Sequence, residues 1–440
     1  MAGQSTARDV ALRALVACEK QGAWSDGFLK KEIGGAGLDG RDAALATRLC
    51  FGVQQNRMLL DFWLGSLSKV PLSKMEPAVR CALRLGAYQI MLLDRVPDHA
   101  AVNQAVEQAR QNSRNPRSAG LVNGVLRNLI RQKNVLPQPA DLVTRYSHPL
   151  WLVDAFAQRL PPDELEALLA ADNSEPPTCV QVNTCKVETP VVIAALQQEG
   201  MEVQPHPWLP DCLLLQGTGN LEQSIAFQKG WFYVQDAAAK LAVLAADPRP
   251  GMDVLDACAA PGGKSFAAAI AMNGQGQVTS CDIHPHKQVL IQRGADRLGL
   301  AIIQAEVLDA KSYKENFLDR FDLVIADVPC SGLGIIRKKP DIRYKEPEPL
   351  NSLPRVQSTI LENVSRYVKP GGVLLYATCT LLERENEAVV EMFTGKQKDF
   401  ILEGFQLPGP FGECADGMVT CWPHRHGTDG FFFAKLRRHI

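Results

Sequence analysis

The second half of the chain alternates apolar, strand-like segments with helix-favouring ones, and this alternation constrains the fold more than any other feature. From about residue 236, the runs VLDAC, QVTSCD, IIQAEV, FDLVIAD and VLLYATC alternate with helical patterns such as HKQVLIQRGADRLG. Such alternation predicts a mostly parallel sheet with helices on both faces. With two late strands, FILEGF and DGFFFAKLRR, we expect an α/β domain of seven strands over residues 236–440. Ligands should bind beyond the carboxyl ends of these strands.

The first part of the chain has the periodicity of helices and no strand-like alternation. Leu12, Leu15 and Val16 follow the i, i+3, i+4 spacing of one helix face. Similar apolar faces run through residues 42–64, 76–93, 99–110 and 121–129. We predict an all-helical domain over residues 1–140, which ends in the linker VLPQPADL. A small α+β connector should follow over residues 141–235, where strand and helix patterns are mixed.

The formal net charge of −1 conceals an asymmetry between the two parts. Residues 1–145 contain 20 Lys and Arg against 12 Asp and Glu, whereas the remainder contains 27 against 36. A basic segment joined to an acidic one indicates contact with a polyanion such as a nucleic acid. A solvated basic surface on a helical domain explains the same charge equally well.

The composition is that of a globular protein whose cysteines are reduced. Twelve cysteines are scattered over 440 residues without the density of a disulfide scaffold. No apolar run approaches the ~20 residues that cross a bilayer. The first residues, MAGQSTARDVALRAL, lack the apolar segment of a signal peptide. We expect a cytoplasmic, monomeric protein without a membrane partner.

The segment VLDACAAPGGKS predicts a ligand-binding loop between a buried strand and a helix. Gly262 and Gly263 let the backbone approach a ligand closely, and the helix that follows offers unpaired N–H groups. A P-loop needs glycine where this chain has Cys258, and the dinucleotide pattern G-x-G-x-x-G is absent. We therefore expect S-adenosylmethionine, with Asp282 at its ribose and Asp309 near its adenine.

Two further loops each follow a strand and contain a cysteine. FDLVIADVPCSGLG places Asp327 and Cys330 after one strand, and LLYATCT places Cys379 after another. A thiolate that adds to carbon 6 of a pyrimidine makes carbon 5 able to accept a methyl group, and a carboxyl group near N3 assists. Each cysteine alone is more simply a small buried apolar residue. Two of them beside a cofactor loop favour a reactive pair, but the pattern does not rank them.

Two other patterns allow more than one interpretation. The pattern C-x-x-H-x-H occurs twice, beginning at Cys281 and at Cys421, and its ligands suit zinc. Because a predicted strand contains Cys281 and a proline interrupts both patterns, we expect no metal. The segment RKKPDIRY, residues 337–344, is either a solvated loop or a phosphate-binding one, and its position beside a cysteine loop favours the second.

Taken together, these motifs resemble the RNA cytosine-C5 methyltransferases. The resemblance rests on DACAAPGGKS, DVPCSGLG, RKKPDIRY, YATCT followed by ENE, and DGFFFAKL. In the helical part, HAAVNQAVEQAR and AGLVNGVLRNLI are similar to the NusB-like RNA-binding domain. The combination implies a Rossmann-like methyltransferase domain joined to a NusB-like domain. It also implies S-adenosylmethionine as the cofactor and 16S ribosomal RNA, naked or in an assembling small subunit, as the substrate.

The resemblance further implies roles for individual residues. Cys379 is implied as the nucleophile that bonds to cytosine, Cys330 as a residue that helps to release the product, and Asp327 as the group that orients the ring. Lys264 is implied beside them in the catalytic site. The residues implied to contact the cofactor are Cys258, Ala259, Ala260, Pro261, Gly262, Gly263, Lys264, Asp282, Asp309 and Asp327. Those implied to contact RNA are Arg337, Lys338 and Asn183.

A few positions depart from the family pattern, and two other functions stay as alternatives. Gln181 stands where relatives commonly have arginine, whereas Thr380 and Val328 replace a common serine and alanine without removing a catalytic group. A DNA cytosine-C5 methyltransferase would use a cysteine such as Cys330 as its nucleophile. A non-enzymatic RNA-binding assembly factor would explain the basic helical part, but not the glycine loop together with both cysteines.

Overall fold

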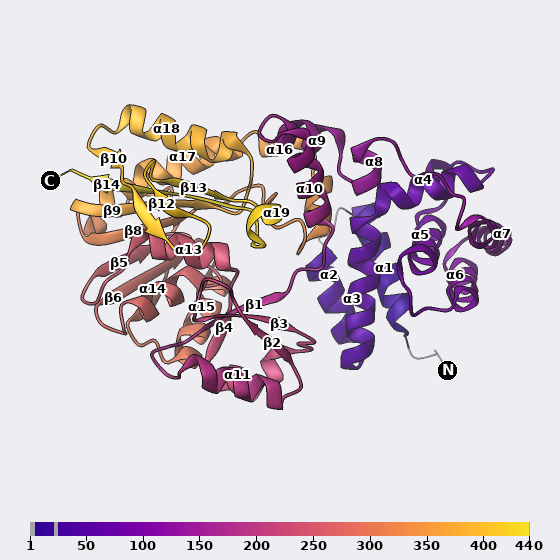
Figure 1. Cartoon of the computed structure of the whole chain (residues 1–440), viewed down its shortest axis with the longest axis horizontal. Helices are drawn as coiled ribbons and strands as arrows, with labels where there is room; N and C mark the ends of the chain where they lie inside the picture. Colours follow the sequence, from indigo (N-terminus) through magenta and orange to yellow (C-terminus); the bar gives the residue numbers. More distant parts are fainter. Residues whose placement is uncertain (1–4, 22–24, 440) are drawn as a thin grey trace. The chain divides into compact units, whose positions relative to one another are not determined.

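The chain divides into two compact units in the computed structural model, which describes residues 5–21 and 25–439 (Figure 1). The helical unit extends to residue 175 and includes the segment 336–345. The α/β unit consists of the residues from 176 onward without that segment. The segment 336–345 therefore leaves the α/β unit shortly after the Cys330 loop and returns to it at residue 346.

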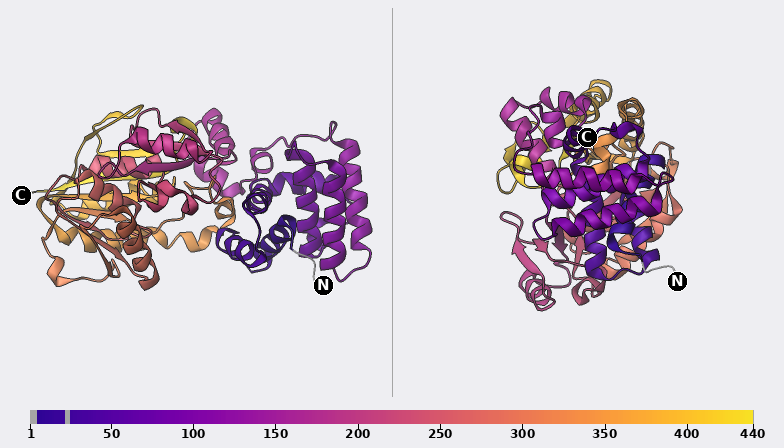
Figure 2. Two further views of the ribbon diagram at one scale, coloured as in Figure 1. Left: turned by 90° about the horizontal axis from the view of Figure 1, so that it is seen from below. Right: turned by 90° about the vertical axis from the view of Figure 1, so that its right-hand side faces the viewer.

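The helical unit consists of helices, and α8 (Leu142–Tyr146), α9 (Leu150–Ala157) and α10 (Pro162–Asp172) lie beyond residues 1–140, over which we predict an all-helical domain. The helices before them are α1 (Ala7–Gln21), α2 (Ser25–Ala36), α3 (Gly40–Gln55), α4 (Arg57–Leu67), α5 (Pro77–Leu92), α6 (Asp98–Asn112) and α7 (Ser118–Gln132). Leu12 and Leu15 are buried on one face of α1. The apolar face predicted over residues 42–64 divides at Asn56, between α3 and α4. Helices α5, α6 and α7 lie side by side (Figures 1 and 2).

The segment 336–345 is anchored in the helical unit by a short 3-10 helix, Pro340–Tyr344. Arg343 is fully buried and donates hydrogen bonds to Asn173 Oδ1 at 2.7 Å and to the Tyr146 carbonyl at 3.1 Å. The hydroxyl of Tyr344 donates to the carbonyl of Gln54 at 2.9 Å. A buried guanidinium with these acceptors is an anchor, so the interpretation of RKKPDIRY as a solvated loop is wrong for its last two residues.

The α/β unit begins with a small antiparallel sheet. Its strands are β1 (Thr178–Val182), β2 (Glu202–Pro205), β3 (Cys212–Gln216) and β4 (Phe232–Val234), in the order β2-β3-β1-β4, and its helices are α11 (Thr189–Gln198) and α12 (Ile225–Gln228). One face packs Val180 and Leu213 against Leu196 of α11. The opposite face places Cys179 and Cys212 in the core of the large sheet that follows, so the two sheets share one unit.

The large sheet has eight strands, one more than the seven that we expected. Its strands are β5 (Asp253–Asp256), β6 (Gln277–Asp282), β7 (Ile303–Val307), β8 (Phe321–Asp327), β9 (Val368–Thr378), β10 (Phe400–Leu402), β13 (Met418–Cys421) and β14 (Phe431–Arg438). The order is β10-β14-β9-β8-β5-β6-β7, and β13 pairs with β14. Strands β5 to β9 are parallel, whereas β14 runs antiparallel to β9.

Two short segments explain the different strand count. The eighth strand, β13, has only four residues, MVTC, which is too short for its alternation to predict a strand. The predicted strand FILEGF is divided into β10 and β11 (Phe405–Leu407), and β11 pairs with β12 (Gly412–Cys414) outside the large sheet.

Helices cover both faces of the large sheet. Successive strand residues point to opposite faces, and here both sets are apolar and need to be buried. These helices are α13 (Ala237–Ala246), α14 (Gly263–Ala271), α15 (Pro285–Leu298), α17 (Leu353–Val364) and α18 (Glu387–Lys396), and two single turns are α16 (Pro347–Leu350) and α19 (Pro423–His426). Leu323 and Ile325 of β8 pack in one core with α13, α14 and α15. Val324 and Ala326 pack in the other core with α17 and α18 (Figure 1).

Candidate active site

Four strands of the large sheet end in a polar residue at one edge. Strand β5 ends in Asp256, β6 in Asp282, β8 in Asp327 and β9 in Thr378. Because these strands are parallel neighbours, their carboxyl ends lie at the same edge of the sheet. The fold therefore brings the glycine loop and both cysteine loops together.

The loop between β5 and α14 contains two successive glycines, and the backbone conformation requires glycine at the first of them. Gly262 has a φ of 112°, and a Cβ there would lie 2.4 Å from the ring of Phe266. A Cβ on Gly263 would lie 2.9 Å from the amide of Gln235. The backbone N–H groups of residues 263–265 open α14 and make no hydrogen bond with a described residue. Free donors at a helix N-terminus suit an anionic group of a ligand.

Asp256 is a buried carboxyl group beside this loop. Its Oδ2 accepts a hydrogen bond from Ser265 Oγ at 2.7 Å, whereas its Oδ1 has no partner among the described residues. Burial raises the pKa of Asp256 to about 7. Burial and the charge of Asp256 also raise the pKa of the Cys258 thiol well above its ordinary value, so this thiol stays neutral. An unpaired acceptor and free N–H donors fit a ligand that carries both an ammonium and a carboxylate group.

Two more carboxylates stand at the ends of the neighbouring strands. Asp282 accepts a hydrogen bond from the His284 N–H at 2.9 Å, and its Oδ2 lies 3.5 Å from Lys287 Nζ. Asp309 follows β7 by two residues and accepts from the Lys311 N–H at 3.0 Å. Local turns therefore hold both side chains at the carboxyl edge of the sheet, on the side of β6 and β7.

A buried ion pair joins the glycine loop to the β8 loop. Lys264 Nζ lies 2.6 Å from Asp327 Oδ2 and 4.8 Å from the centre of the Phe431 ring. Burial lowers the pKa of Lys264, but the charge and hydrogen bond of Asp327 outweigh burial, so the pKa lies above its ordinary value. The Lys264 side chain is 9% exposed and that of Asp327 is 30% exposed. Lys264 therefore stays charged and leaves part of the carboxylate open to a ligand.

The sulfur atoms of Cys330 and Cys379 are 3.2 Å apart. Both residues are partly exposed, and neither is in a disulfide. The hydrogen bond with Cys379, and then burial, raise the pKa of Cys330 well above its ordinary value, and the charges of Glu385 and Asp327 add to this. Either sulfur can donate the hydrogen bond of this contact. The structure therefore brings the two cysteines into contact, and the contact by itself does not rank them.

Glu385 holds the two cysteine loops together, a role that its sequence context does not predict. Its Oε2 accepts hydrogen bonds from the Ser331 N–H and from Gln357 Nε2, each at 2.9 Å. Ser331 Oγ in turn lies 2.7 Å from Thr380 Oγ1 in the other loop. Glu385 is fully buried, although the charged run ERENE suggests an exposed helix start. Helix α18 begins only at Glu387, and the family motif ENE was the available signal for a special role.

The loop after Cys330 passes very close to the loop before β14. A Cβ on Gly334 would lie 1.9 Å from the carbonyl oxygen of Gly430. The N–H of Gly334 donates to the Cys379 carbonyl at 2.9 Å, and the N–H of Gly430 donates to the Gly334 carbonyl at 2.7 Å. These bonds fix the backbone of one cysteine loop against the other.

The three residues expected to contact RNA have different surroundings. Asn183 is fully buried, and its Nδ2 donates to the carbonyls of Gly230 and Leu298 at 3.2 and 2.8 Å. Arg337 is also buried, whereas Lys338 is partly exposed, and both belong to the segment 336–345. The burial of Asn183 gives it a structural task and gives no support to an RNA contact.

Metal ligands are not clustered in the part of the chain that the structure describes. Within residues 5–21 and 25–439, no group of three His, Cys, Asp or Glu side chains is placed to hold a metal ion. Cys281 lies inside β6, and His426 Nδ1 accepts a hydrogen bond from the Trp422 N–H at 2.8 Å. No helix among the described residues is both long and apolar enough to cross a bilayer.

Three family models match successive parts of the chain. The model of the NusB family matches residues 5–131, and the model of the ferredoxin-like domain of RsmF/B-like methyltransferases matches residues 148–222. The model described as 16S rRNA methyltransferase RsmB/F matches residues 243–437. The last of these matches covers the glycine loop and both cysteine loops.

Known proteins are similar to this chain along its whole length. The probable ribosomal RNA small subunit methyltransferase B of Bacillus subtilis (strain 168) is 38% identical, over 99% of each chain. The protein of the same name from Synechocystis sp. is 34% identical, over 98% of this chain and 99% of its own. Among solved structures, that of PH0851 superposes with a TM-score of 0.80 at 26% identity and covers 98% of each chain.

Proposed function

The chain belongs to the RsmB/F family of 16S rRNA methyltransferases, and on this premise we propose that it methylates carbon 5 of a cytosine through a covalent bond from Cys379 to the base. The observation that carries the proposal is the contact of 3.2 Å between the sulfur atoms of Cys330 and Cys379. Methylation of an exocyclic nitrogen or a hydroxyl group needs no thiol nucleophile, whereas carbon 5 needs one because it is a poor nucleophile by itself.

Cys379 supplies the nucleophile in this proposal. Its thiolate adds to carbon 6 of cytosine and forms a C–S bond, while the electron pair of the C5=C6 bond moves toward carbon 5. Once carbon 5 carries the methyl group, a base removes the remaining proton from that carbon. The electron pair left behind re-forms the double bond, and the Cys379 thiolate departs as the leaving group.

Cys330 assists the departure of Cys379. Its raised pKa keeps it a thiol, and the contact of 3.2 Å lets it donate a hydrogen bond to the Cys379 sulfur. Such a bond stabilises negative charge on that sulfur, both before attack and when the C–S bond breaks. The resemblance to the family supports Cys379 as the nucleophile, and the contact supports Cys330 as a donor to it.

Asp327 orients the cytosine ring, and Lys264 fixes the carboxylate. Lys264 binds Oδ2 at 2.6 Å, so that the exposed part of the carboxylate is left for the N3 edge of the base. A fixed carboxylate adds little reorganisation during the reaction, which is the usual advantage of a preorganised polar group.

S-adenosylmethionine is the methyl donor, and when bound it supplies an electrophilic methyl group. The residues that we propose to hold it are Cys258, Ala259, Ala260, Pro261, Gly262, Gly263, Lys264, Asp282, Asp309 and Asp327. The free N–H groups that open α14 take its carboxylate, and the unpaired oxygen of Asp256 takes its ammonium group. Asp282 binds the ribose hydroxyls and Asp309 lies near the adenine.

The proposed function also includes a domain organisation, an RNA substrate and a cellular location for the protein. It assigns residues 1–140 to a NusB-like domain, 141–235 to a connector and 236–440 to the methyltransferase domain. Arg337 and Lys338 contact phosphates of the 16S rRNA, which is bound naked or in an assembling small subunit. The protein acts as a monomer in the cytoplasm.

Mapping of 5-methylcytosine in 16S rRNA tests this function. Unmodified 16S rRNA is incubated with the protein and S-adenosylmethionine, and bisulfite sequencing then locates protected cytosines. The proposal predicts protection at a specific cytosine in the RNA and none in DNA of the same sequence. Methylation of the DNA, or of a position other than carbon 5 in the RNA, would contradict it.

A further inference from the structure

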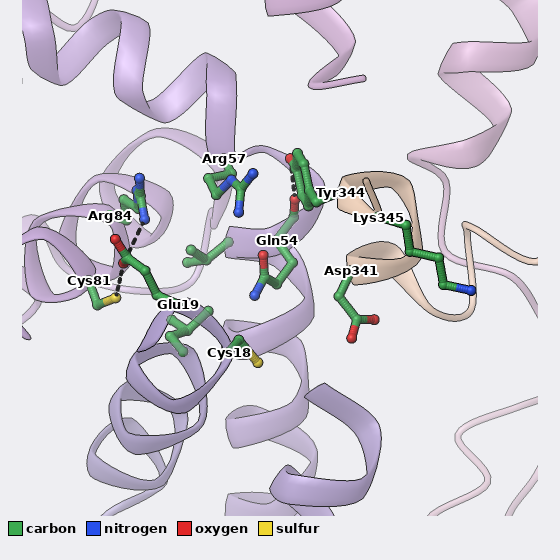
Figure 3. Close-up of a pocket in the computed structure, with 11 residues that line it drawn as sticks. Cys18, Glu19, Gln54, Arg57, Cys81, Arg84, Asp341, Tyr344 and Lys345 are labelled. Carbon is green, nitrogen blue, oxygen red and sulfur yellow. Dashed lines mark hydrogen bonds and ion pairs between the residues drawn. The ribbon is translucent and has the colours of Figure 1, made fainter. Parts of the chain in front are cut away.

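The helical unit contains a cavity that the proposed reaction does not use. Its volume is about 310 Å³, within the size range of small-ligand sites. The cavity is lined by Leu15, Cys18, Glu19, Val53, Gln54, Arg57, Cys81, Arg84, Asp341, Tyr344 and Lys345. Helices α1, α3, α4 and α5 and the segment 336–345 therefore all contribute to its wall (Figure 3). All of these residues belong to one unit.

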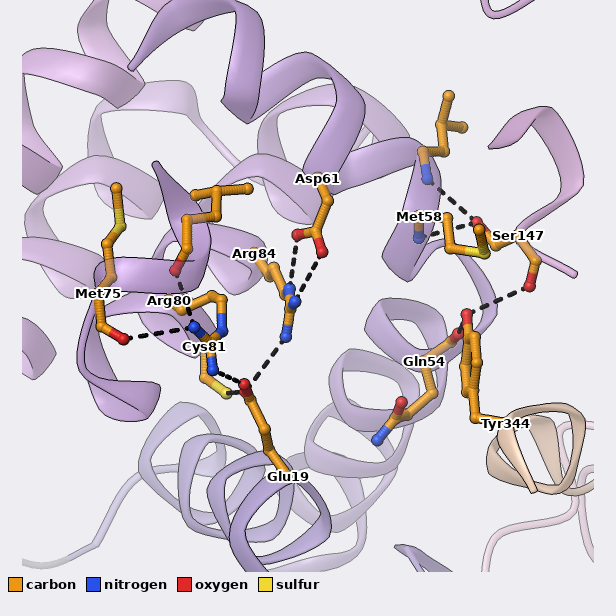
Figure 4. Close-up of polar contacts among 12 residues, drawn as sticks. Glu19, Gln54, Met58, Asp61, Met75, Arg80, Cys81, Arg84, Ser147 and Tyr344 are labelled. Atoms are coloured by element: carbon orange, nitrogen blue, oxygen red, sulfur yellow. Dashed lines mark hydrogen bonds and ion pairs between the residues drawn. The ribbon is translucent and has the colours of Figure 1, made fainter. Parts of the chain in front are cut away.

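Most charged groups of the wall are already paired. Arg84 donates to both carboxylate oxygens of Asp61, at 2.7 and 2.6 Å, and to Glu19 at 3.2 Å. Arg80, just behind the wall, donates to the other oxygen of Glu19 and to the carbonyl of Met75 (Figure 4). These bonds satisfy the carboxylates of Glu19 and Asp61.

Arg57 is different, because its guanidinium makes no hydrogen bond or ion pair with a described residue. Its Cζ lies 3.4 Å from the centre of the Tyr344 ring, so the planar group is stacked on the ring. Burial lowers the pKa of Arg57, and the interaction with Tyr344 opposes this in part. Arg57 is partly exposed and lines the cavity, so its donors can reach a ligand there. The donors of Arg57 are thus oriented by Tyr344 but are not satisfied by the protein.

The remaining charged groups of the wall favour an anion as the ligand of Arg57. Asp341 and Lys345 have opposite charges, and each already takes part in an interaction within the protein. Glu19 is neutralised by two arginines. The uncompensated charge of the wall is therefore the positive charge of Arg57. A stacked guanidinium presents its donors in a planar fork, which matches the oxygens of a phosphate group.

We infer that this cavity binds a phosphate group through Arg57, with Tyr344 holding the guanidinium in place. The phosphate comes either from the RNA backbone or from a free phosphate compound. The RNA source rests on the proposed RNA substrate, whereas phosphate binding itself does not. Because Tyr344 and Asp341 lie in the segment that follows the Cys330 loop, an occupied cavity would also touch the segment that carries Arg337 and Lys338.

Thermal unfolding in inorganic phosphate tests the site on the full chain. The melting temperature is measured as chloride is replaced by phosphate at constant ionic strength. We expect a saturable increase of a few degrees for the unchanged protein, because a ligand that binds only the folded state stabilises it. Arg57→Gln should abolish the increase. Arg41→Gln, which removes an exposed arginine of α3, should retain it.

Binding of a 16S rRNA fragment at several salt concentrations identifies the source of the phosphate. If the RNA supplies it, Arg57→Gln weakens binding about tenfold and reduces the log–log salt slope by ~0.7 relative to Arg41→Gln. If Arg57→Gln abolishes the increase in melting temperature but leaves RNA binding unchanged, the site binds a free phosphate compound. The inference would be overturned if Arg57→Gln showed the same phosphate-dependent increase in melting temperature and the same RNA binding as the unchanged protein. Where the Gln variant does not fold, Arg57→Lys replaces it, since it keeps the charge and loses the planar fork. Neither experiment involves methyl transfer, so failure of the cysteine chemistry would not affect the outcome.

Discussion

Cys330 and Cys379 are 49 residues apart in the chain, yet their sulfur atoms lie within 3.2 Å of each other. Two parallel strands, β8 and β9, deliver them to the same edge of the sheet, and the buried Glu385 fixes the loop of one against the loop of the other. The proposed mechanism depends on this contact, because the thiol of Cys330 must donate a hydrogen bond to the sulfur of Cys379.

Gly334→Ala should reduce methylation about 100-fold, since small displacements of reacting groups have effects of this size. A methyl group at this position would lie 1.9 Å from the Gly430 carbonyl oxygen and would push the two cysteine loops apart. Methyl incorporation into 16S rRNA measures the effect. Gly395→Ala is the control, because a Cβ there meets no atom within 4 Å, and it should keep full activity. Equal activities of the two variants would show that the loop contact is unimportant.

Lys264→Met should leave Asp327 without its cation and reduce the rate of methylation by about 100-fold or more. The same change should lower the free energy of unfolding by about 2 kcal/mol, because it breaks a largely buried pair. Urea unfolding and methyl incorporation measure the two effects. Lys314→Met removes the more exposed pair with Glu306, whose side chain is 38% exposed, and should cost at most about 1 kcal/mol. A similar loss of activity in both variants would argue against a special role for Lys264.

Arg343→Lys should destabilise the helical unit by about 3 kcal/mol, although it keeps the positive charge. A lysine ammonium cannot reach the acceptors of Arg343, which include Asn173 Oδ1 and the carbonyls of Tyr146 and Asp172. Denaturant unfolding of the full chain, followed by circular dichroism, measures the change. Arg117→Lys, at an exposed position, should change the stability by less than about 0.5 kcal/mol. A comparable result for Arg343→Lys would mean that the segment 336–345 is not anchored by this side chain.

His148 should make the stability depend on pH below neutrality. Burial, and then the charge of Arg343, lower the pKa of His148 from 6.5 to about 4, so the folded state holds it neutral. Because the unfolded state binds this proton more readily, stability is lost as the pH falls from about 6.5 toward 4. We expect the side chain to account for a loss of about 2 kcal/mol between pH 7 and pH 5. In urea unfolding at both pH values, His148→Gln should show a smaller loss than the unchanged protein, and an identical loss would refute the assignment.

The sequence predicts the edge of the sheet well, because local patterns determine it. Apolar runs that end in Asp282 and Asp327 identify strand ends, and the carboxyl ends of parallel strands must meet at one edge. For the same reason, the glycines of the cofactor loop can be recognised without the structure. The contact between the two cysteines cannot be recognised in this way, because it joins atoms that are far apart in the chain.

The sequence does not reveal that certain charged residues inside charged segments are buried and hold the structure together. Glu385 lies in ERENE and Arg343 in RKKPDIRY, where composition indicates exposure, yet both are fully buried. Their burial is possible only because partners from distant segments satisfy them, Ser331 and Gln357 for Glu385 and Asn173 for Arg343. Strand β13 was missed for a related reason, because its four residues form a strand only beside β14.

Trapping of the covalent intermediate tests the central claim most directly. Cys379→Ala and Cys330→Ala are each incubated with 16S rRNA and S-adenosylmethionine, and denaturing gels then detect protein that is bonded to RNA. Cys379→Ala should form no adduct, whereas Cys330→Ala should accumulate one, because the leaving thiolate loses its hydrogen-bond donor. An adduct in Cys379→Ala and none in Cys330→Ala would contradict the account and assign the attack to Cys330.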